Sequence, residues 1–588
     1  MSPDLPEGGL EEAPAPEDAE MSPAEMSPAE MSPAALPGIA EEEEGVETGS
    51  AIETDRLASA VADILSLRCG TCHDGGRADG GLGQVHDLAQ LITAGAIVPG
   101  SSATSPLVQV LTDGSMPPVT PHNAPPLSSG EVALVARFVD QLPTTPPAAC
   151  DALPYVSSDE VYAALLADVQ AASPEDRPFL RYAGLTYASN GGSCGPALAR
   201  QRSALFKMVN SVSSTPEIHV PRAIDADGLL YRIDLRDYGW NHEIDLEDDG
   251  SPDFANGWLA IAAAAQPYAL ELAGTEADEL KRFTGAVVPF LPANALVHAA
   301  TAGDLYYALV GERRTGNATR AQLGVELDLY DADPLPMYAG FSAAGPWSGD
   351  RRVTRAEQQA RPGRFYWSLE EDTQTSASSI YEDPLTFRSS EPVPFIYNLP
   401  NGLQAYGIEG ADGALLRSVP LRCDAGDCKE TALLNAVACQ ACHEAGLVPA
   451  TDWVREIFEK NALLYDNDTA ATISATYPGA LEFAQLLSDG SQLHLDALQR
   501  AGVTLGGPEP ISFVYYQFER TALGLRRAAG ELGVTPEELR SVITSTSGGL
   551  TPLLAADGVI ERSALDSAYV ATRCALDPGA RNRPVACP

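Results

Sequence analysis

Residues 439–443 read Cys439-Gln440-Ala441-Cys442-His443, and the same spacing occurs earlier at Cys69-Gly70-Thr71-Cys72-His73. In each C-x-x-C-H stretch, two thiols three positions apart are followed directly by an imidazole. Thiols at this spacing reach the two vinyl groups of one porphyrin, and the adjacent histidine then lies beneath the iron. The sequence therefore predicts two covalently bound haem c groups, attached through Cys69, Cys72, Cys439 and Cys442 and ligated by His73 and His443.

Two other site types use a C-x-x-C spacing. A zinc knuckle or a redox dithiol would need further cysteine or histidine pairs nearby. Only Cys423 and Cys428, near the second stretch, are candidates for such a pair. We therefore favour haem at both positions.

The sixth iron ligand of the first haem is predicted to be Met116. It lies 43 residues after His73 in Gly114-Ser115-Met116-Pro117-Pro118, and no other methionine occurs between residues 32 and 207. The prolines would stiffen the loop that carries the thioether. Histidine–methionine ligation raises the reduction potential and closes the iron to substrates, which suits electron transfer. The rival ligands His86 and His122 are expected to face solvent.

The sixth ligand of the second haem stays open, because no methionine occurs in the 145 residues after His443. His494 is the leading single candidate, although a histidine among Leu493, Leu495 and Leu498 is also typical of an ordinary helix. The iron could instead be five-coordinate. Further candidates are His219, His242, His298, Met208, Met337, Tyr306 and Tyr307.

Charge and hydropathy limit the partners. The formal net charge of the 588-residue chain is −44, and residues 1–50 contribute 14 acidic and no basic residues. Such a field repels nucleic acid and anionic lipid. Only four lysines are present, so we expect a redox partner that is itself basic. No apolar run is long enough to span a bilayer.

Six of the ten cysteines lie outside the two C-x-x-C-H stretches. An even remainder in a haem c protein indicates an oxidising compartment and up to three disulfides, with free buried thiols as the alternative. Proximity favours Cys423–Cys428 and Cys574–Cys587, and elimination then leaves Cys150–Cys194. We expect the protein to be exported to the periplasm or cell surface. No signal peptide opens the sequence, so we expect it to be the mature part of the protein or to have a misplaced start.

The chain is expected to be mainly α-helical with a minor β part, in four regions. Residues 1–50 form an acidic Pro/Ala/Glu tail that acts as a spacer, for example from a membrane tether. Residues 51–145 form a compact helical domain, 151–390 a mixed α/β middle region, and 391–588 a C-terminal haem domain with a β-hairpin and helices.

Local signals place several elements. Leu57, Val61, Ile64 and Leu65 share one face of a helix that leads to Cys69. Helix starts are predicted after Ser128, Ser157, Ser173 and Thr535. A helix is predicted from Cys194 to Val212, a strand from Leu229 to Leu235, and a hairpin around Pro400-Asn401-Gly402.

Residues 51–145 resemble the class I cytochrome c module of planctomycete and myxobacterial multidomain proteins, through Arg68-Cys69-x-x-Cys72-His73, Ser115-Met116-Pro117-Pro118 and Leu127-Ser128. The remainder is similar to an uncharacterised bacterial haem c family. That likeness rests on residues 176–182, on residues 233–240, on Tyr397-Asn398-Leu399-Pro400-Asn401-Gly402-Leu403-Gln404-Ala405-Tyr406, and on the second haem motif with Gly446 behind it. The resemblance implies architecture and a haem, and no substrate.

Three functions are compatible with these features. The favoured one is electron transfer between redox partners through two haems. The second is a peroxidase-like haem enzyme, in which the N-terminal haem feeds an open C-terminal haem. The third is a haem sensor or scaffold without catalytic activity.

Overall fold

The structure is a computed structural model. The chain divides into two units, Met1–Ala51 and Ile52–Pro588, and the expected acidic tail lies outside the described residues. The structure describes residues 57–58, 61–62, 64–66, 69, 85, 88–93, 96–112, 116, 127–142, 155–329, 332–343, 349–372, 379–420, 432–504, 509–543, 549–576 and 581–587.

The first region is a small helical core. Its described elements are α2 (Leu88–Thr93), the 3-10 turn η2 (Ser102–Thr104), α3 (Pro106–Thr112) and α4 (Ser129–Gln141). Ser128 and Glu131 form the predicted capping box, each side chain bonding to the other's backbone N–H. Leu57, Val61 and Leu65 are buried on the predicted helix face, and Cys69 belongs to the same apolar cluster.

The middle region begins with the predicted capping box of Ser157 and Glu160 at α5 (Ser158–Ala171). A small sheet follows, in the order β2-β3-β1-β5, with β1 (Leu180–Gly184) antiparallel to β3 (Leu230–Asp234) and parallel to β5 (Phe290–Pro292). The strand β3 lies where the alternating pattern predicted one. The other elements are β2 (Arg222–Ala223), α6 (Thr186–Asn190), α7 (Gly195–Ser211), η5 (Leu235–Tyr238), α8 (Gly257–Ala264), β4 (Leu272–Gly274), α9 (Thr275–Thr284), α10 (Ala293–Ala300), α11 (Gly303–Val310) and α12 (Gly316–Leu323).

The helix predicted after Ser173 does not form. The Ser173 hydroxyl does accept the backbone N–H of Asp176 at 3.2 Å, as in a helix cap. The chain then makes only the 3-10 turn η4 (Arg177–Phe179) before β1 begins at Leu180. Pairing of β1 with β3 and β5 fixes these residues as a strand, so tertiary contacts override the local signal.

A five-stranded antiparallel sheet follows in the described chain, in the order β10-β9-β8-β7-β6. Its strands are β6 (Met337–Ala343), β7 (Gly349–Glu357), β8 (Phe365–Asp372), β9 (Val393–Asn398) and β10 (Gln404–Glu409). The last two form the predicted hairpin, with Gln404 opposite Asn398. The expected boundary at residue 390 lies between β8 and β9, inside this sheet.

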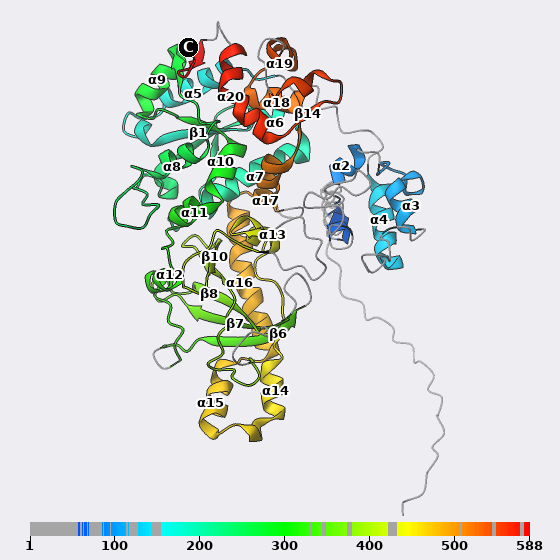
Figure 1. Cartoon of the computed structure of the whole chain (residues 1–588), viewed down its shortest axis with the longest axis vertical. Helices are drawn as coiled ribbons and strands as arrows, with labels where there is room; N and C mark the ends of the chain where they lie inside the picture. Colours follow the sequence, from blue (N-terminus) through cyan, green and yellow to red (C-terminus); the bar gives the residue numbers. More distant parts are fainter. Residues whose placement is uncertain are drawn as a thin grey trace, which may run out of the picture. The chain divides into compact units, whose positions relative to one another are not determined.

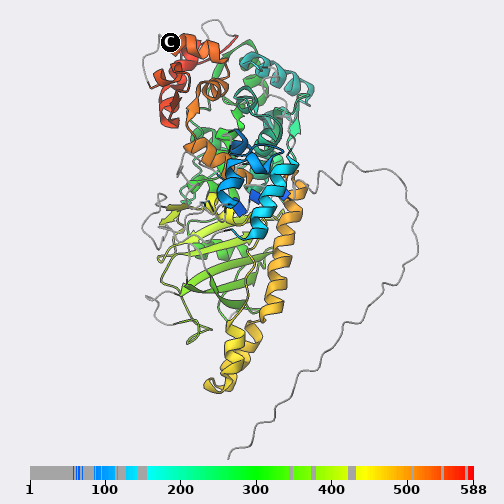
Figure 2. The same ribbon diagram turned by 90° about the vertical axis from the view of Figure 1, so that its right-hand side faces the viewer.

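The 21-residue helix α16 (Ala480–Arg500) runs along this sheet (Figures 1 and 2). Its Phe483 and Leu487 form an apolar cluster with Trp367 of β8, Ala339 of β6 and Leu447. Nearby elements are β11 (Ser418–Pro420), β12 (Ala432–Leu434), α13 (Val437–Cys442), α14 (Val454–Lys460), η6 (Ala462–Leu464) and α15 (Asn467–Thr476).

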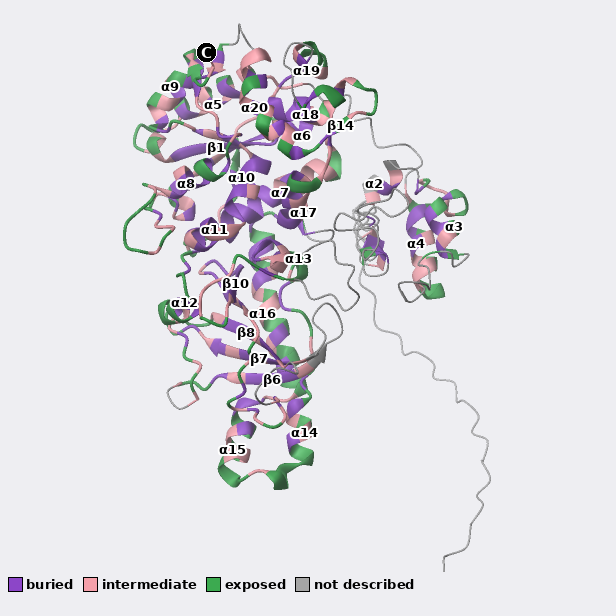
Figure 3. Cartoon of the chain, viewed as in Figure 1, coloured by how far each residue is buried: buried purple, intermediate pink, exposed green. Residues whose placement is uncertain are grey.

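The last helices return to the middle region. Helix α17 (Pro510–Arg520) packs against α7 and α10, and α18 (Leu525–Leu532) packs against α6. Figure 3 shows the buried residues concentrated in α7, α10 and α17. The remaining elements are β13 (Leu523–Gly524), α19 (Pro536–Ile543) with its predicted Thr535 cap, η7 (Thr551–Leu554), β14 (Val559–Ile560), α20 (Arg562–Leu576) and β15 (Asn582–Pro584), which pairs with β4.

Helices make up the larger share of the structure and strands the smaller, which confirms the expected mainly α composition. The predicted disulfide Cys574–Cys587 is present, with a Cα–Cα distance of 5.3 Å. Cys194 is also disulfide-bonded, to a cysteine outside the described residues. Cys150, Cys423 and Cys428 all lie outside the described residues. None of the described helices combines the length and apolar character needed to cross a bilayer.

Candidate functional site

The second C-x-x-C-H stretch forms the short helix α13 and its C-cap residue, His443. Cys439 and Cys442 are three positions apart in this helix, so their side chains project from the same side. His443 follows at the point where the helix ends. The local conformation therefore brings two thiols and an imidazole together within five residues.

The backbone before α13 is held in a strained turn. Ala436 is fully buried, with φ of 62° and ψ of −59°, and the Val437 N–H donates to the Asn435 carbonyl at 2.8 Å. This is a γ-turn whose central residue has positive φ, which costs on the order of 1–3 kcal/mol without glycine. Two hydrogen bonds hold this turn. The Asn435 side-chain amide donates to the Tyr406 carbonyl at 3.0 Å, and the Ser512 hydroxyl donates to the Val437 carbonyl at 2.5 Å.

His443 is fixed in one tautomer. Its Nδ1 lies 2.9 Å from the carbonyl oxygen of Gly446, and a carbonyl can only accept, so Nδ1 carries the proton and Nε2 presents a lone pair. Burial lowers the pKa of His443, which keeps the ring neutral. This is the form of histidine that binds a metal through Nε2.

Helix α16 sets the position of the Gly446 carbonyl. Gly446 has φ of +100°, and a Cβ there would lie 2.7 Å from Cα and Cβ of Ser491. The Leu447 N–H donates to the Ser491 hydroxyl at 2.9 Å. The loop after His443 is thus packed directly onto α16, and only glycine fits at this contact.

His494 is on α16, one turn beyond Ser491, and it is buried. Its Nδ1 accepts the backbone N–H of Gln404 at 3.2 Å, so in the neutral ring Nε2 carries the proton. Burial, with smaller contributions from Lys207 and His443, holds the pKa of His494 well below its ordinary value. Its Nε2 has no hydrogen-bond partner in the described part of the chain. His494 therefore presents a buried N–H donor near His443.

The two thiols are protonated. Burial raises the pKa of Cys439 to about 12 and also raises the pKa of Cys442. Reactive dithiols instead have a lowered thiol pKa. Between the cysteines, Gln440 is buried, and neither its amide oxygen nor its amide nitrogen has a partner in the described structure. The site thus combines neutral thiols with unpaired polar atoms.

Buried tyrosines and one carboxyl group surround this site. The Tyr406 ring centroid is 6.0 Å from that of His443, and the Tyr406 N–H donates to the Tyr306 hydroxyl at 3.0 Å. Glu312 is buried, and neither of its oxygens makes a hydrogen bond of normal geometry in the described part. Burial raises the pKa of Glu312 well above its ordinary value, although the Tyr397 hydroxyl offsets part of the rise. At neutral pH we expect Glu312 to be largely protonated.

A buried ion pair lies near His494. Lys207 Nζ on α7 is 2.8 Å from Glu509 Oε1, and both side chains are 2% exposed. The Glu509 carboxylate also caps α17 by accepting the Ile511 and Ser512 N–H groups. The pair links α7 to α17 beside His494.

Less of the first motif is described. Cys69 is buried in the N-terminal apolar cluster, and Cys72 and His73 lie outside the described residues. Met116 is 40% exposed, and its N–H donates to the Val110 carbonyl at 3.0 Å. The Met116 side chain therefore does not act as a core filler. His86 and His122 also lie outside the described residues.

The other candidate ligands have partners or positions of their own. His298 Nε2 is 2.5 Å from a Glu519 oxygen, and Met337 accepts from Arg355 at 3.4 Å. Met208 is buried on α7, as its apolar helix face predicted. His219 Nδ1 is 3.8 Å from Asp237, and His242 is exposed. Tyr306 and Tyr307 are buried, and the Tyr307 hydroxyl donates to the Leu416 carbonyl.

Sequence reasoning did not identify Tyr406, Gln404, Glu312 or the Lys207–Glu509 pair as parts of this site. The sequence contains one indication for Lys207, namely a lysine placed between apolar residues of a predicted helix. Within the described residues, no cluster of three or more His, Cys, Asp or Glu could hold a metal ion. Comparison of the chain with protein-family models, curated proteins and solved structures found no match.

Proposed function

We propose that the chain is an exported di-haem c-type cytochrome that transfers electrons between redox partners at the periplasm or cell surface. One haem c would be held by Cys69, Cys72, His73 and Met116 in an N-terminal cytochrome c domain. The other would be held by Cys439, Cys442 and His443.

The tautomer of His443 carries the proposal. A histidine that ligates haem iron needs a free Nε2, and its Nδ1–H is commonly held by a carbonyl or carboxylate. The Nδ1–H donated to Gly446 provides this arrangement directly after two cysteines at haem c spacing. A redox dithiol is less well supported, because burial raises the pKa of both thiols.

The residues around the site fit a haem in two further respects. The unpaired amide of Gln440 and Nε2 of His494 are buried polar atoms that lack a polypeptide partner in the described structure, and such atoms normally find one. When bound, haem iron supplies one-electron redox chemistry. The chain's own residues orient the ligand, with α16 fixing the Gly446 carbonyl and that carbonyl fixing the His443 ring.

A second function is favoured by one observation. Because Nδ1 of His494 accepts from Gln404, Nε2 bears a proton and would donate a hydrogen bond rather than an electron pair. A buried donor beside an open iron fits the peroxidase-like alternative, whereas ligation by His494 requires the ring to exchange its Gln404 contact. The two functions therefore predict opposite roles for this residue.

The haem count tests the proposal. The protein is produced through an export and haem-attachment pathway, and bound haem is measured by the alkaline pyridine assay. We expect two haems in the parent chain and one in each double variant, Cys69→Ala/Cys72→Ala and Cys439→Ala/Cys442→Ala. The disulfide variant Cys574→Ala/Cys587→Ala is the matched control and should retain two. A parent chain with fewer than two haems would contradict the proposal.

The ferric spin state of His494→Ala then separates the two functions. If His494 closes the site, the parent has two low-spin haems and the variant has one high-spin haem. If the site is open, the parent already contains a high-spin haem that binds carbon monoxide when reduced and turns over peroxide. The N-terminal haem serves as the low-spin reference in both proteins.

A further inference from the structure

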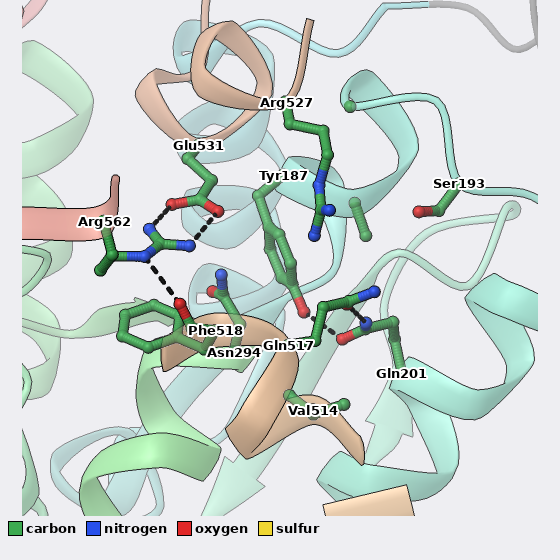
Figure 4. A pocket seen from close by; sticks show the side chains of 12 residues that line it. Tyr187, Ser193, Gln201, Asn294, Val514, Gln517, Phe518, Arg527, Glu531 and Arg562 are labelled. Atoms are coloured by element: carbon green, nitrogen blue, oxygen red, sulfur yellow. Dashed lines mark hydrogen bonds and ion pairs between the residues drawn. The ribbon is translucent and has the colours of Figure 1, made fainter. Parts of the chain in front are cut away.

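A second polar site lies away from the cysteines, in a hollow bordered by α6, α7, α10, α17, α18 and α20 (Figure 4). Helix α18 approaches α6 so closely that a Cβ on Gly530 would lie 2.6 Å from the Gly191 nitrogen. This contact places Arg527 and Glu531 of α18 over Tyr187. The cavity volume is about 20 Å³, a little more than the ~10–15 Å³ that one water needs, so an occupant must be an ion or molecule of very few atoms.

Arg527 supplies an unpaired positive charge. It lines the hollow, and among the described residues no hydrogen bond or ion pair engages its guanidinium. Burial lowers the pKa of Arg527, yet a guanidinium stays charged at any physiological pH. Arg527 is half-buried, and a charge withdrawn this far from water normally has an acceptor.

The neighbouring carboxylate is already neutralised. Arg562 bonds both oxygens of Glu531, and its Nε donates to the Phe518 carbonyl at 2.9 Å. These contacts are drawn in part in Figure 4. The two arginines and Glu531 therefore leave one net positive charge at the hollow, in a chain whose formal charge is −44.

A chain of hydrogen bonds directs a second donor into the hollow. The Tyr187 hydroxyl donates to Gln201 Oε1 at 2.7 Å. Gln201 Nε2 then donates to Gln517 Oε1 at 2.7 Å. In this arrangement Gln517 is bonded through its amide oxygen. The amide nitrogen of Gln517 is left with its N–H groups free in the hollow.

The Ser193 hydroxyl also lines the hollow, across from Arg527 (Figure 4). Arg527 and the Gln517 amide nitrogen present N–H groups only, and the serine hydroxyl can donate as well. We propose that this hollow binds a small planar oxyanion of the size of formate or nitrate. The flat guanidinium would pair with two oxygens of the anion, and Gln517 and Ser193 would bond the remaining acceptor positions.

Sodium formate labelled with ¹³C is the probe, with sodium nitrate as competitor. Ionic strength is held constant with the sodium salt of a bulky sulfonate buffer that is too large for the hollow. Formate line width and the thermal midpoint of the protein are followed against formate concentration. We expect saturable broadening, a rising thermal midpoint and displacement by nitrate.

Arg527→Gln should weaken formate binding by at least about tenfold, a factor that corresponds to the loss of one charge-assisted contact. Arg526→Gln, which removes the same charge from the same helix outside the hollow, should change binding less than about twofold. Gln517→Leu keeps the approximate shape and should also weaken binding, which keeps the test open if Arg527→Gln does not fold. Absence of saturable binding, or equal binding by the parent and Arg527→Gln, would overturn the proposal.

Discussion

Substitution of Gly446 by alanine probes the link between α16 and the haem-motif histidine. Two costs add. A φ of +100° disfavours any L-residue by about 1–2 kcal/mol, and the new Cβ would lie 2.7 Å from Cα and Cβ of Ser491, an overpacking that costs about 1–3 kcal/mol. We therefore expect Gly446→Ala to lower the free energy of unfolding by about 2–5 kcal/mol.

Gly363→Ala is the matched control. Gly363 also has positive φ, +75°, but a Cβ there meets nothing within 4 Å, so only the backbone cost of about 1–2 kcal/mol applies. Urea unfolding followed by tryptophan fluorescence measures both variants. In the haem-loaded protein, Gly446→Ala should also shift the reduction potential of one haem, because the His443 Nδ1–H loses its acceptor. If the two variants lose equal stability and both potentials stay unchanged, the proposed packing of Gly446 on Ser491 is wrong.

Three further predictions concern buried charge and the N-terminal ligand. Lys207→Met should lower the free energy of unfolding in urea by about 3–5 kcal/mol, because the Glu509 charge is left unpaired. The double variant Lys207→Met/Glu509→Gln should recover at least half of that loss. No recovery would mean that the unpaired charge is not the cause. The pKa of Glu312 is higher in the folded than in the unfolded protein. Glu312 is therefore least unfavourable to folding at low pH, and the free energy of unfolding falls by about 1.4 kcal/mol per pH unit above pH 4.5. Glu312→Gln should remove that slope in urea midpoints measured from pH 5 to 8, whereas Glu482→Gln, at an exposed site, should leave it in place. Met116→Ala should abolish the far-red methionine–iron absorption band and lower the potential of one haem only; survival of the band would exclude Met116 as ligand.

Local signals were sufficient where the stabilising contacts are local. The capping boxes at Ser128 and Ser157 and the turn at Pro400-Asn401-Gly402 satisfy backbone groups within a few residues, so the sequence alone predicts them. The signal at Ser173 is of the same kind, yet β1 pairs with strands about 50 and 110 residues away, and that pairing prevails.

The candidate site divides in the same way. The C-x-x-C-H spacing identifies Cys439, Cys442 and His443 directly. The contact of Lys207 with Glu509 spans 302 residues, and neither residue carries a local mark of that distant partner. His494 could be named from the sequence, but its tautomer depends on the Gln404 N–H, which only the packing of β10 against α16 supplies.

The return of the last helices to the middle region has a consequence for the timing of maturation. Helices α6, α7 and α10 are covered by α17 and α18, and β4 is paired by β15, so this part of the protein cannot close until the chain beyond residue 580 has emerged. Cys439 is only partly buried and Cys442 is exposed in the completed fold, and both cysteines emerge well before that point. The order of the sequence thus leaves both thiols accessible throughout the folding of the middle region, as covalent attachment of the proposed haem would require.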